Sequence, residues 1–378
     1  MDFQLTDEQR MIQSMVRDFA EKEVKPLAAE IDREEKVPTE SIRKMGELGL
    51  LGMVVPKEYG GSGTDYVSYA IATSEIARVC ASTAALLSGA NSLNCWPILE
   101  YGTEEQKQKY LVPMASGKTY GCFGLTEAGA GSDIGGIRTK AELEGDEYAI
   151  NGNKLFITSG NIADTLTVFA RTGEDPTRGL SAFLVEKETE GFSVGKVEEK
   201  LGIRGTSTVE LIFEDCRIPK ENLLGEEGQG FKIALSTLDG GRIGIAACAV
   251  GVAQGCLELS VQYSKEREQF GQPISNFQAI QWKLADMATQ TEAARLLLYR
   301  AAAKKDRGER YTVESSMAKL FASEMATKIA IDAVQIHGGY GYTKEYAVER
   351  FMRDVKIFEI FEGTSEIQRL VIARSLLK

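Results

Sequence analysis

The segment Glu362-Gly363-Thr364 carries the clearest candidate for chemistry in this sequence. Glu362 ends an apolar run, Gly363 leaves free space beside it, and Thr364 can cap a following helix. A carboxylate at an apolar edge can have a raised pKa and can take a proton from a substrate. A solvated acid at a helix start, favoured by the helix dipole, is the alternative, and the local pattern alone favours that alternative.

The single histidine, His337, limits the chemistry that the rest of the chain can perform. A single histidine excludes HExxH proteases and His-rich zinc sites. A Ser-His-Asp triad would use this one histidine and leave no other. Its place between Ile336 and Gly338 is typical of a structural or cofactor-contacting residue. We therefore expect no metal site, and base chemistry falls to a carboxylate, lysine, tyrosine or cysteine.

A glycine-rich segment, Gly129-Ala130-Gly131-Ser132, resembles a phosphate-binding loop but does not complete the GxGxxG pattern, because residue 134 is isoleucine. Its backbone N–H groups could still bind a phosphate or a carbonyl-rich ring. A plain turn before a strand fits the segment equally well.

Four segments together resemble the acyl-CoA dehydrogenase family, and the resemblance covers essentially the whole chain. They are GLTEAGAGSDIGGIRTKA from Gly124, LDGGRIGIAA from Leu238, QIHGGYGYTKEYAVERFMRD from Gln335 and FEGTSEIQRLVIAR from Phe361. The chain is most similar to the short-chain, butyryl-CoA type. In this family the glutamate before Gly-Thr is the catalytic base, which reverses the preference drawn from the local pattern of Glu362.

The resemblance implies α,β-dehydrogenation of a short straight-chain acyl-CoA to the trans-2-enoyl-CoA. Glu362 would remove the α-proton while the β-hydrogen leaves as hydride to FAD, and electrons would pass to an electron-transferring flavoprotein. The positions matching FAD contacts are Phe123, Leu125, Thr126, Phe156, Thr158, Arg267, Gln269, Phe270, Gln335, Gly338, Gly339, Thr364 and Glu366. Those matching substrate contacts are Ser132, Asp239, Arg242, Phe361 and Gly363.

Four positions refine what the resemblance implies. Many members carry Trp where this chain has Phe156 and Pro where it has Ala128, so flavin packing and spectrum can differ. A branched-chain subgroup carries its base at the position of Gly241, which cannot serve, so the base must be Glu362. A glutaryl-CoA subgroup carries Arg where this chain has Ala85, which predicts an apolar pocket for the acyl tail.

Three further functions remain as alternatives. The first is the reverse direction, as an enoyl-CoA reductase working with a bifurcating electron-transferring flavoprotein. The second is a DNA-associated alkylation-response flavoprotein, which would need a basic face, whereas the formal charge here is −11. The third is an acyl-CoA oxidase, although oxidase chains are much longer.

The elements that position these residues follow an order of helix, strand and helix. Capping boxes begin helices at Thr6 and Thr103, and short apolar residues from Val67 to Leu93 predict a buried helix. The predicted strands are a hairpin turning at Asn151-Gly152, followed by Thr165–Arg171, Leu180–Glu186 and Val209–Glu214. The later predicted helices are a bundle seam from Phe277 to Ala301, ended by Gly308, and a helix from Val313 to Ile336.

We therefore predict an α+β fold with an N-terminal helical domain (1–119), a central β-barrel-like or sandwich domain (120–226) and a C-terminal four-helix bundle (227–378). A Rossmann unit is excluded because helices do not alternate with the strands. The family precedent is a homotetramer built as a pair of dimers, in which Arg267 to Phe270 reach the FAD of a neighbouring subunit.

Bulk features predict a cytoplasmic protein that binds neither nucleic acid nor membrane. The six cysteines lie in apolar runs without a CxxC motif, which is typical of reduced core residues. The N-terminus is too polar for a signal peptide, and no apolar stretch is expected to reach membrane-spanning length.

Overall fold

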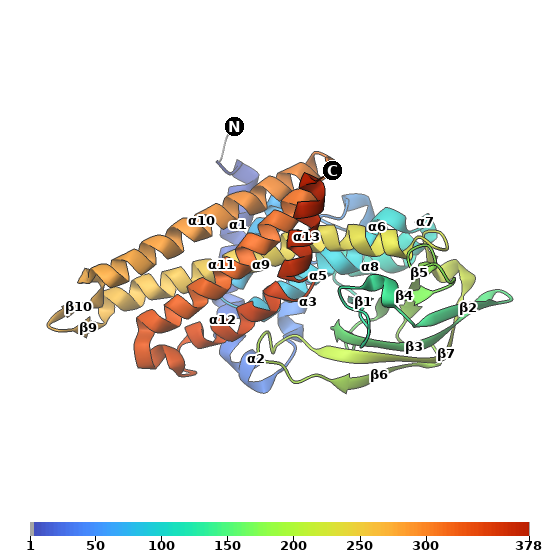
Figure 1. Cartoon of the computed structure of the whole chain (residues 1–378), viewed down its shortest axis with the longest axis horizontal. Coiled ribbons are helices and arrows are strands. Elements are labelled where there is room, and N and C mark those ends of the chain that lie inside the picture. Colours follow the sequence, from blue (N-terminus) through green and yellow to red (C-terminus); the bar gives the residue numbers. More distant parts are fainter. Residues whose placement is uncertain (1–3, 378) are drawn as a thin grey trace.

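The computed structural model describes residues 4–377, so residues 1–3 and 378 of the predicted terminal domains lie outside the described part. Helices come first, strands follow, and helices return around the long central helix α9 (Gly230–Glu266) (Figure 1). This order confirms the predicted α+β fold class.

The first region is helical up to Ala115. Its helices are α1 (Asp7–Phe19), α2 (Ala28–Glu34), α3 (Thr39–Glu47), α4 (Tyr66–Ala77), α5 (Ala81–Gly89), α6 (Trp96–Tyr101), α7 (Glu104–Gln106) and α8 (Val112–Ala115). Both capping boxes are confirmed, with Thr6 before α1 and Thr103 before α7. The prediction of a single buried helix from Val67 to Leu93 is wrong, because residues 78–80 are not helical and separate α4 from α5. A π-helical turn, η4 (Ala90–Cys95), continues α5.

The central region is one mixed sheet. Its strands are β1 (Gly121–Gly124), β2 (Lys140–Glu144), β3 (Glu147–Thr158), β4 (Thr165–Arg171), β5 (Leu180–Glu186), β6 (Phe192–Val197), β7 (Thr208–Pro219) and β8 (Leu223–Leu224). The strand order is β6-β7-β3-β2-β4-β5-β8, and β1 pairs in parallel with β4. The predicted bounds of β4 and β5 are confirmed. The predicted strand Val209–Glu214 is the first half of β7, and β6 was not predicted.

The hairpin predicted at Asn151-Gly152 is wrong. The turn lies at Gly145 and Asp146 instead, and Asn151-Gly152 falls inside the long strand β3. There the register with β7 shifts by a bulge, and the Asn151 side chain accepts a hydrogen bond from the Asp215 N–H at 2.8 Å. Pairing with β7 therefore uses this Asn-Gly pair as a bulge rather than as a turn.

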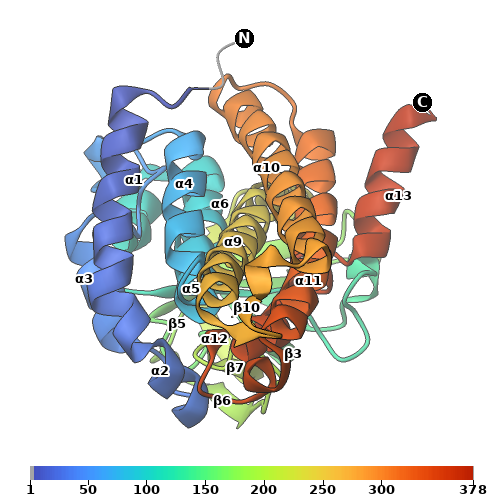
Figure 2. The ribbon, with the colours of Figure 1, turned by 90° about the vertical axis from the view of Figure 1, so that its left-hand side faces the viewer.

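The third region is helical, with α9, α10 (Gln278–Asp306), α11 (Thr312–His337), α12 (Ala347–Val355) and α13 (Ser365–Leu376). A small hairpin of β9 (Glu268–Gln269) and β10 (Gln272–Pro273) joins α9 to α10. Helices α9, α10 and α11 pack on one another, and α13 packs on α11 (Figure 2). The predicted seam of α10 is buried only from Met287 onward, whereas Ile280 and Leu284 are half-buried.

Helix α9 is the core of the molecule and packs against α4, α5, α10 and α11. Contrary to the sequence-based expectation, it is long and apolar enough by composition to cross a membrane, with a mean hydropathy of 1.6 over its most apolar window. However, 78% of that window is buried inside the molecule, as in a core helix. All six cysteines are buried and unpaired, as predicted.

Candidate active site

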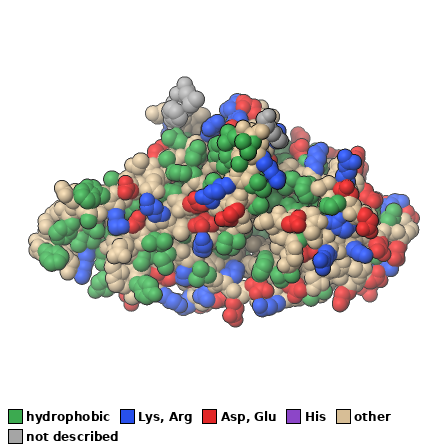
Figure 3. All heavy atoms as spheres, viewed as in Figure 1, with side chains coloured by type: hydrophobic (Ala, Val, Ile, Leu, Met, Phe, Trp, Pro, Cys, Tyr) green, Lys and Arg blue, Asp and Glu red, His purple; other side chains and the backbone are tan. Residues whose placement is uncertain are grey.

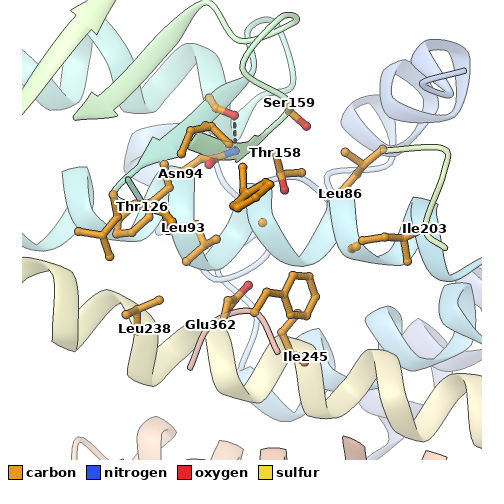
Figure 4. Close-up of a pocket in the computed structure, with 18 of the residues that line it drawn as sticks. Leu86, Leu93, Asn94, Thr126, Thr158, Ser159, Ile203, Leu238, Ile245 and Glu362 are labelled. Carbon is orange, nitrogen blue, oxygen red and sulfur yellow. Dashed lines mark hydrogen bonds between the residues drawn. The ribbon is translucent and has the colours of Figure 1, made fainter. Parts of the chain in front are cut away.

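A cleft of about 850 Å³, counted out to open solvent, lies between the sheet and helix α9 (Figure 4). Its walls come from α5 and η4, from β1 and the segment after it, from the end of β3, from α9 and from the loop before α13. The lining is mainly apolar. It comprises Ala85, Leu86, Gly89, Leu93, Asn94, Tyr120, Gly121, Phe123, Leu125, Thr126, Phe156, Ile157, Thr158, Ser159, Ile203, Leu238, Ile245, Phe361 and Glu362.

Glu362 points into this cleft from the loop between the 3₁₀ turn η10 (Lys356–Glu359) and α13 (Figure 4). Its backbone has a φ of 53°, a left-handed conformation that costs a non-glycine residue free energy and that is found at functional sites. Carboxylate atom Oε2 is buried and accepts no hydrogen bond. Because a buried charge without a hydrogen bond is costly, this orphaned oxygen indicates a functional carboxylate.

The carboxylate lies directly over Gly241 on α9. A Cβ added at residue 241 would overlap Oε2 of Glu362 and would lie 3.0 Å from its Cδ. Only glycine leaves room for the carboxylate at this point of the helix.

Burial raises the pKa of Glu362 to about 7, and the cations of Lys319 and Arg242 keep the pKa from rising further. Lys319 on α11 is fully buried, and its Nζ donates a hydrogen bond to the Gly363 carbonyl at 2.6 Å. Arg242 is 3% exposed and pairs with Asp239 at 2.5 Å. A carboxyl with a pKa near neutrality can accept a proton at physiological pH and is a suitable general base.

Five of the predicted FAD-contacting residues come together in the cleft with Glu362, namely Phe123, Leu125, Thr126, Phe156 and Thr158. Phe156 is 59% exposed and has a φ of 59°, so the backbone turns an aromatic ring outward at the cleft. The Leu155 N–H donates to the Thr126 carbonyl at 2.8 Å, which ties the end of β3 to the segment after β1.

A buried ion pair reinforces this connection. Lys154 has a side chain with no exposed surface, and its Nζ donates to Glu127 at 2.7 Å. The Glu127 carboxylate also accepts from the N–H groups of Arg138 and Thr139 at 2.7 and 3.0 Å. Sequence reasoning did not find this pair.

A second group of predicted FAD residues meets elsewhere. Arg267, Gln269, Gly338 and Gly339 line a hollow together with His337 at the end of α9 and α11 that carries β9 and β10. This end lies opposite the sheet in Figure 1. Within one chain, the structure therefore does not bring these residues to the cleft.

Two further residues of this predicted set do not line the hollow. Phe270, at the tip of the β9–β10 hairpin, is 93% exposed, and Gln335 is exposed on α11. The single histidine is buried and stacks on Tyr263 with ring centroids 4.3 Å apart. Its Nδ1–H donates a hydrogen bond to the Ala333 carbonyl at 2.8 Å.

Four more of the predicted site residues are neighbours of Glu362 in the sequence, namely Phe361, Gly363, Thr364 and Glu366. Phe361 lines the cleft, and Gly363 takes a φ of 94° immediately after the glutamate. Thr364 caps α13, as predicted, by accepting from the Ile367 N–H at 3.3 Å. Glu366 is exposed in the first turn of that helix.

Apart from Gly363, which follows Glu362 but does not line the cleft, three other predicted substrate residues lie outside its lining. Asp239 and Arg242 bond to each other on α9, and Ser316 and Thr312 of α11 bond to the same pair. Ser132 is exposed on the loop before β2, outside the cleft.

Lys319 and Gln368 are functional candidates that sequence reasoning missed. Both are buried and both donate to the Gly363 carbonyl. The sequence did contain a signal for Lys319. It is a cation at helical spacing from the small residues at positions 315, 318, 322 and 326, and these positions are all buried. No sequence signal identified Gln368.

A buried carboxylate faces an apolar cleft between a β region and a helical bundle, and the family models identify this arrangement as that of an oxidoreductase acting on the CH–CH bond of an acyl-CoA. Family models for the N-terminal, middle and C-terminal domains of acyl-CoA dehydrogenase match residues 6–118, 122–216 and 228–377. The chain belongs to the acyl-CoA dehydrogenase family, whose members are flavoproteins.

Two curated relatives match this chain along all or nearly all of their length. A short-chain specific acyl-CoA dehydrogenase of Clostridium acetobutylicum is 54% identical, with both chains covered completely. An acryloyl-CoA reductase (NADH) of Anaerotignum propionicum is 52% identical, over 100% of this chain and 96% of the relative.

Solved structures agree closely with this fold. Butyryl-CoA dehydrogenase of Megasphaera elsdenii has a TM-score of 0.99 at 48% identity, with both chains covered completely. A chain solved in work on the electron transferring flavoprotein of Acidaminococcus fermentans and flavin-based electron bifurcation has a TM-score of 0.99 at 53% identity, again with complete coverage of both chains.

Proposed function

We propose that this protein binds FAD and converts a short, straight-chain acyl-CoA to the trans-2-enoyl-CoA, with Glu362 as the catalytic base. The observation that carries the proposal is the Glu362 carboxylate, which points into an apolar cleft with a buried oxygen that accepts no hydrogen bond. An acyl thioester in this cleft would bring its α-carbon to that oxygen.

The residues of this chain then have distinct tasks. Glu362 takes the α-proton on its carboxylate, and its backbone N–H is expected to donate to the thioester carbonyl as negative charge develops there. The acyl chain excludes water from the cleft and so strengthens the base. FAD, when bound, supplies the redox chemistry by accepting the β-hydrogen as hydride.

The walls of the cleft suit a flavin ring. Phe156 offers an exposed aromatic face, Leu125 offers an apolar one, and Thr126 and Thr158 offer hydroxyl and backbone groups to the polar edge of the ring. Thr126 and Thr158 come from two segments that Lys154 and Glu127 hold together. These residues would hold the flavin in place.

One wall of the cleft carries no charged side chain, which supports an uncharged acyl chain as the substrate. Ala85, Leu86, Gly89 and Leu93 line it and offer no cation to a distal carboxylate. The similarity to short-chain and butyryl-CoA dehydrogenases supports a short acyl chain.

We further propose a homotetramer built as a pair of dimers, in which the hollow at Arg267 serves the FAD of a neighbouring subunit. Two observations support this. The two groups of FAD-matching residues lie apart in one chain, and large apolar side chains are exposed on the C-terminal helices, among them Trp282, Ile331 and Leu370. Figure 3 displays hydrophobic side chains over this half of the molecule and denser charge over the sheet.

An electron-transferring flavoprotein is the proposed electron acceptor, in keeping with the work in which one of the matching structures was solved. The buried, unpaired cysteines support a reducing compartment such as the cytoplasm. The similarity to an acryloyl-CoA reductase favours a second candidate, the reverse reaction driven by NADH through a bifurcating flavoprotein.

Anaerobic titration of the purified flavoprotein with acyl-CoAs of about three to eight carbons, followed by bleaching of the flavin absorbance, tests the proposal. We expect the fastest bleaching with butyryl-CoA. Glu362→Gln should keep FAD and still bind acyl-CoA but lose reduction by several orders of magnitude, roughly 10³-fold or more. Near-normal reduction in that variant would remove Glu362 from the mechanism.

A further inference from the structure

The peptide between Glu362 and Gly363 adopts an unusual backbone conformation. Both residues have positive φ, 53° and 94°. A non-glycine residue keeps such a conformation only where its surroundings hold it. The orientation of the Glu362 carboxylate over Gly241 depends on this conformation, so whatever holds the peptide also aims the carboxylate.

Two buried donors converge on the carbonyl of Gly363. Lys319 Nζ on α11 donates to it at 2.6 Å, and Gln368 Nε2 on α13 donates at 2.8 Å. Gln368 also reaches the Glu362 carbonyl at 3.4 Å. Lys319 has no exposed surface, so its hydrogen bond is shielded from competition with water.

Lys319 differs from the other charged groups around Glu362. Arg242 on α9 is paired with Asp239, and Glu359 on the adjoining turn is paired with Lys356. Within the described residues 4–377, Lys319 makes no ion pair. Burial lowers the pKa of Lys319 to about 8, and the charge of Glu362 keeps it from falling further. Because the pKa of Glu362 is about 7, the lysine is still mostly charged where Glu362 ionises. The other groups facing these two are Tyr69 of α4 and Cys248 of α9, both buried and neutral, and the exposed Glu366 of α13.

We propose that Lys319 is a positioning residue for the reaction. It holds the Gly363 carbonyl so that the Glu362 carboxylate stays over Gly241, and its unpaired buried charge favours the ionised form of the base. This inference rests on the proposed role of Glu362. Gln368 shares the first task and cannot perform the second, because it carries no charge.

The difference between the two donors gives the experiment. The rate of anaerobic flavin reduction by butyryl-CoA is measured from pH 5.5 to 9 in the FAD-loaded enzyme. For Lys319→Met we expect a rate about 10-fold lower, with the pH midpoint raised by about one unit, because the base loses its nearby cation. Lys319→Arg should return the midpoint toward that of the wild type. Gln368→Met should lower the rate and leave the midpoint unchanged.

Lys305→Met is the matched control. Lys305 is a half-buried lysine beside α9. Burial of its ammonium group lowers its pKa to about 7, but it lies over the rings of Tyr66, Trp96 and Tyr311. We expect no change of midpoint there. If Lys319→Met does not fold, Lys319→Gln, which keeps a donor and removes the charge, is expected to raise the midpoint as well.

A folded Lys319 variant without charge that keeps the wild-type midpoint would overturn the inference. So would a Gln368→Met variant whose midpoint rises as far as that of Lys319→Met, since the charge would then not be the cause. Failure of the proposed function is distinguishable, because it requires near-normal reduction in Glu362→Gln, which no result with Lys319 can produce.

Discussion

The carboxylate of Glu362 occupies the space that a side chain at Gly241 would fill. A Cβ at residue 241 would overlap Oε2 of Glu362 and lie 3.3 Å from Leu93 Cδ2. The loop before α13 and the middle of α9 therefore meet at one point, and the residue types at the two positions depend on each other. The family resemblance implies that a branched-chain subgroup, from which this chain differs, carries its base at the position of Gly241. That placement fits the geometry, because a carboxylate from either position can reach the same space.

Gly241→Ala should displace the carboxylate without removing it. Since a shift of about 1 Å can cost about 100-fold in rate, we expect a loss of that order in flavin reduction by butyryl-CoA, with FAD content unchanged. The matched control is Gly240→Ala, where the added Cβ would crowd the flexible end of Lys305, which can move, and would be in ordinary contact with the Tyr311 hydroxyl. Equal rates in the two variants would contradict the packing of Glu362 on Gly241.

The raised pKa of Glu362 predicts how stability depends on pH. The folded-state pKa is about 7 and the ordinary value is 4.5, so between these values the folded state holds a proton that the unfolded state lacks. The stability contributed by this group is present below pH 4.5 and is lost as pH rises through 7.

The difference in Tm, Glu362→Gln minus wild type, should therefore increase as pH rises from 5 to 8. Thermal unfolding of both proteins across this range measures the difference in Tm. The contributions of the other buried acids are the same in both proteins and cancel in this difference. An equal Tm difference at pH 5 and pH 8 would show that the Glu362 carboxyl titrates alike in both states.

The uncharged lining at Ala85 predicts substrate selectivity. We expect kcat/KM of the wild type to be higher with butyryl-CoA than with glutaryl-CoA, because a buried carboxylate without a cation is costly. Ala85→Arg should raise the ratio of glutaryl-CoA to butyryl-CoA by about 10-fold or more, as expected for one buried charge pair. Ala85→Met, of similar length and without charge, should lower both activities without raising the ratio. A wild type that prefers glutaryl-CoA would refute the prediction.

The hollow at Arg267 predicts that cofactor retention and assembly are coupled. Arg267→Glu should lose FAD and fall below the tetramer, as measured by sedimentation and flavin absorbance. Lys265→Glu makes the same charge reversal two residues earlier, outside the hollow, and should leave both unchanged. A fully flavin-loaded monomer at micromolar concentration would exclude the shared site.

The sequence by itself determined the local elements and the family. Thr6, Thr103 and Thr364 cap helices as their side chains predict, because a cap depends only on backbone groups within one turn. The bounds of β4 and β5 were likewise readable, since both strands combine dense apolar residues with flanking turn residues.

Tertiary structure decided everything that depends on partners distant in sequence. Asn151-Gly152 has a strong local turn signal, yet pairing with β7 makes it a bulge, because the hydrogen bonds of a twelve-residue strand outweigh one turn. The local pattern favoured a solvated Glu362, and only the packing of its loop on α9 and α11 buries Oε2 above Gly241 and beside Lys319. Burial and charge at a site are sums over neighbours from several elements, so no single segment of sequence could specify them.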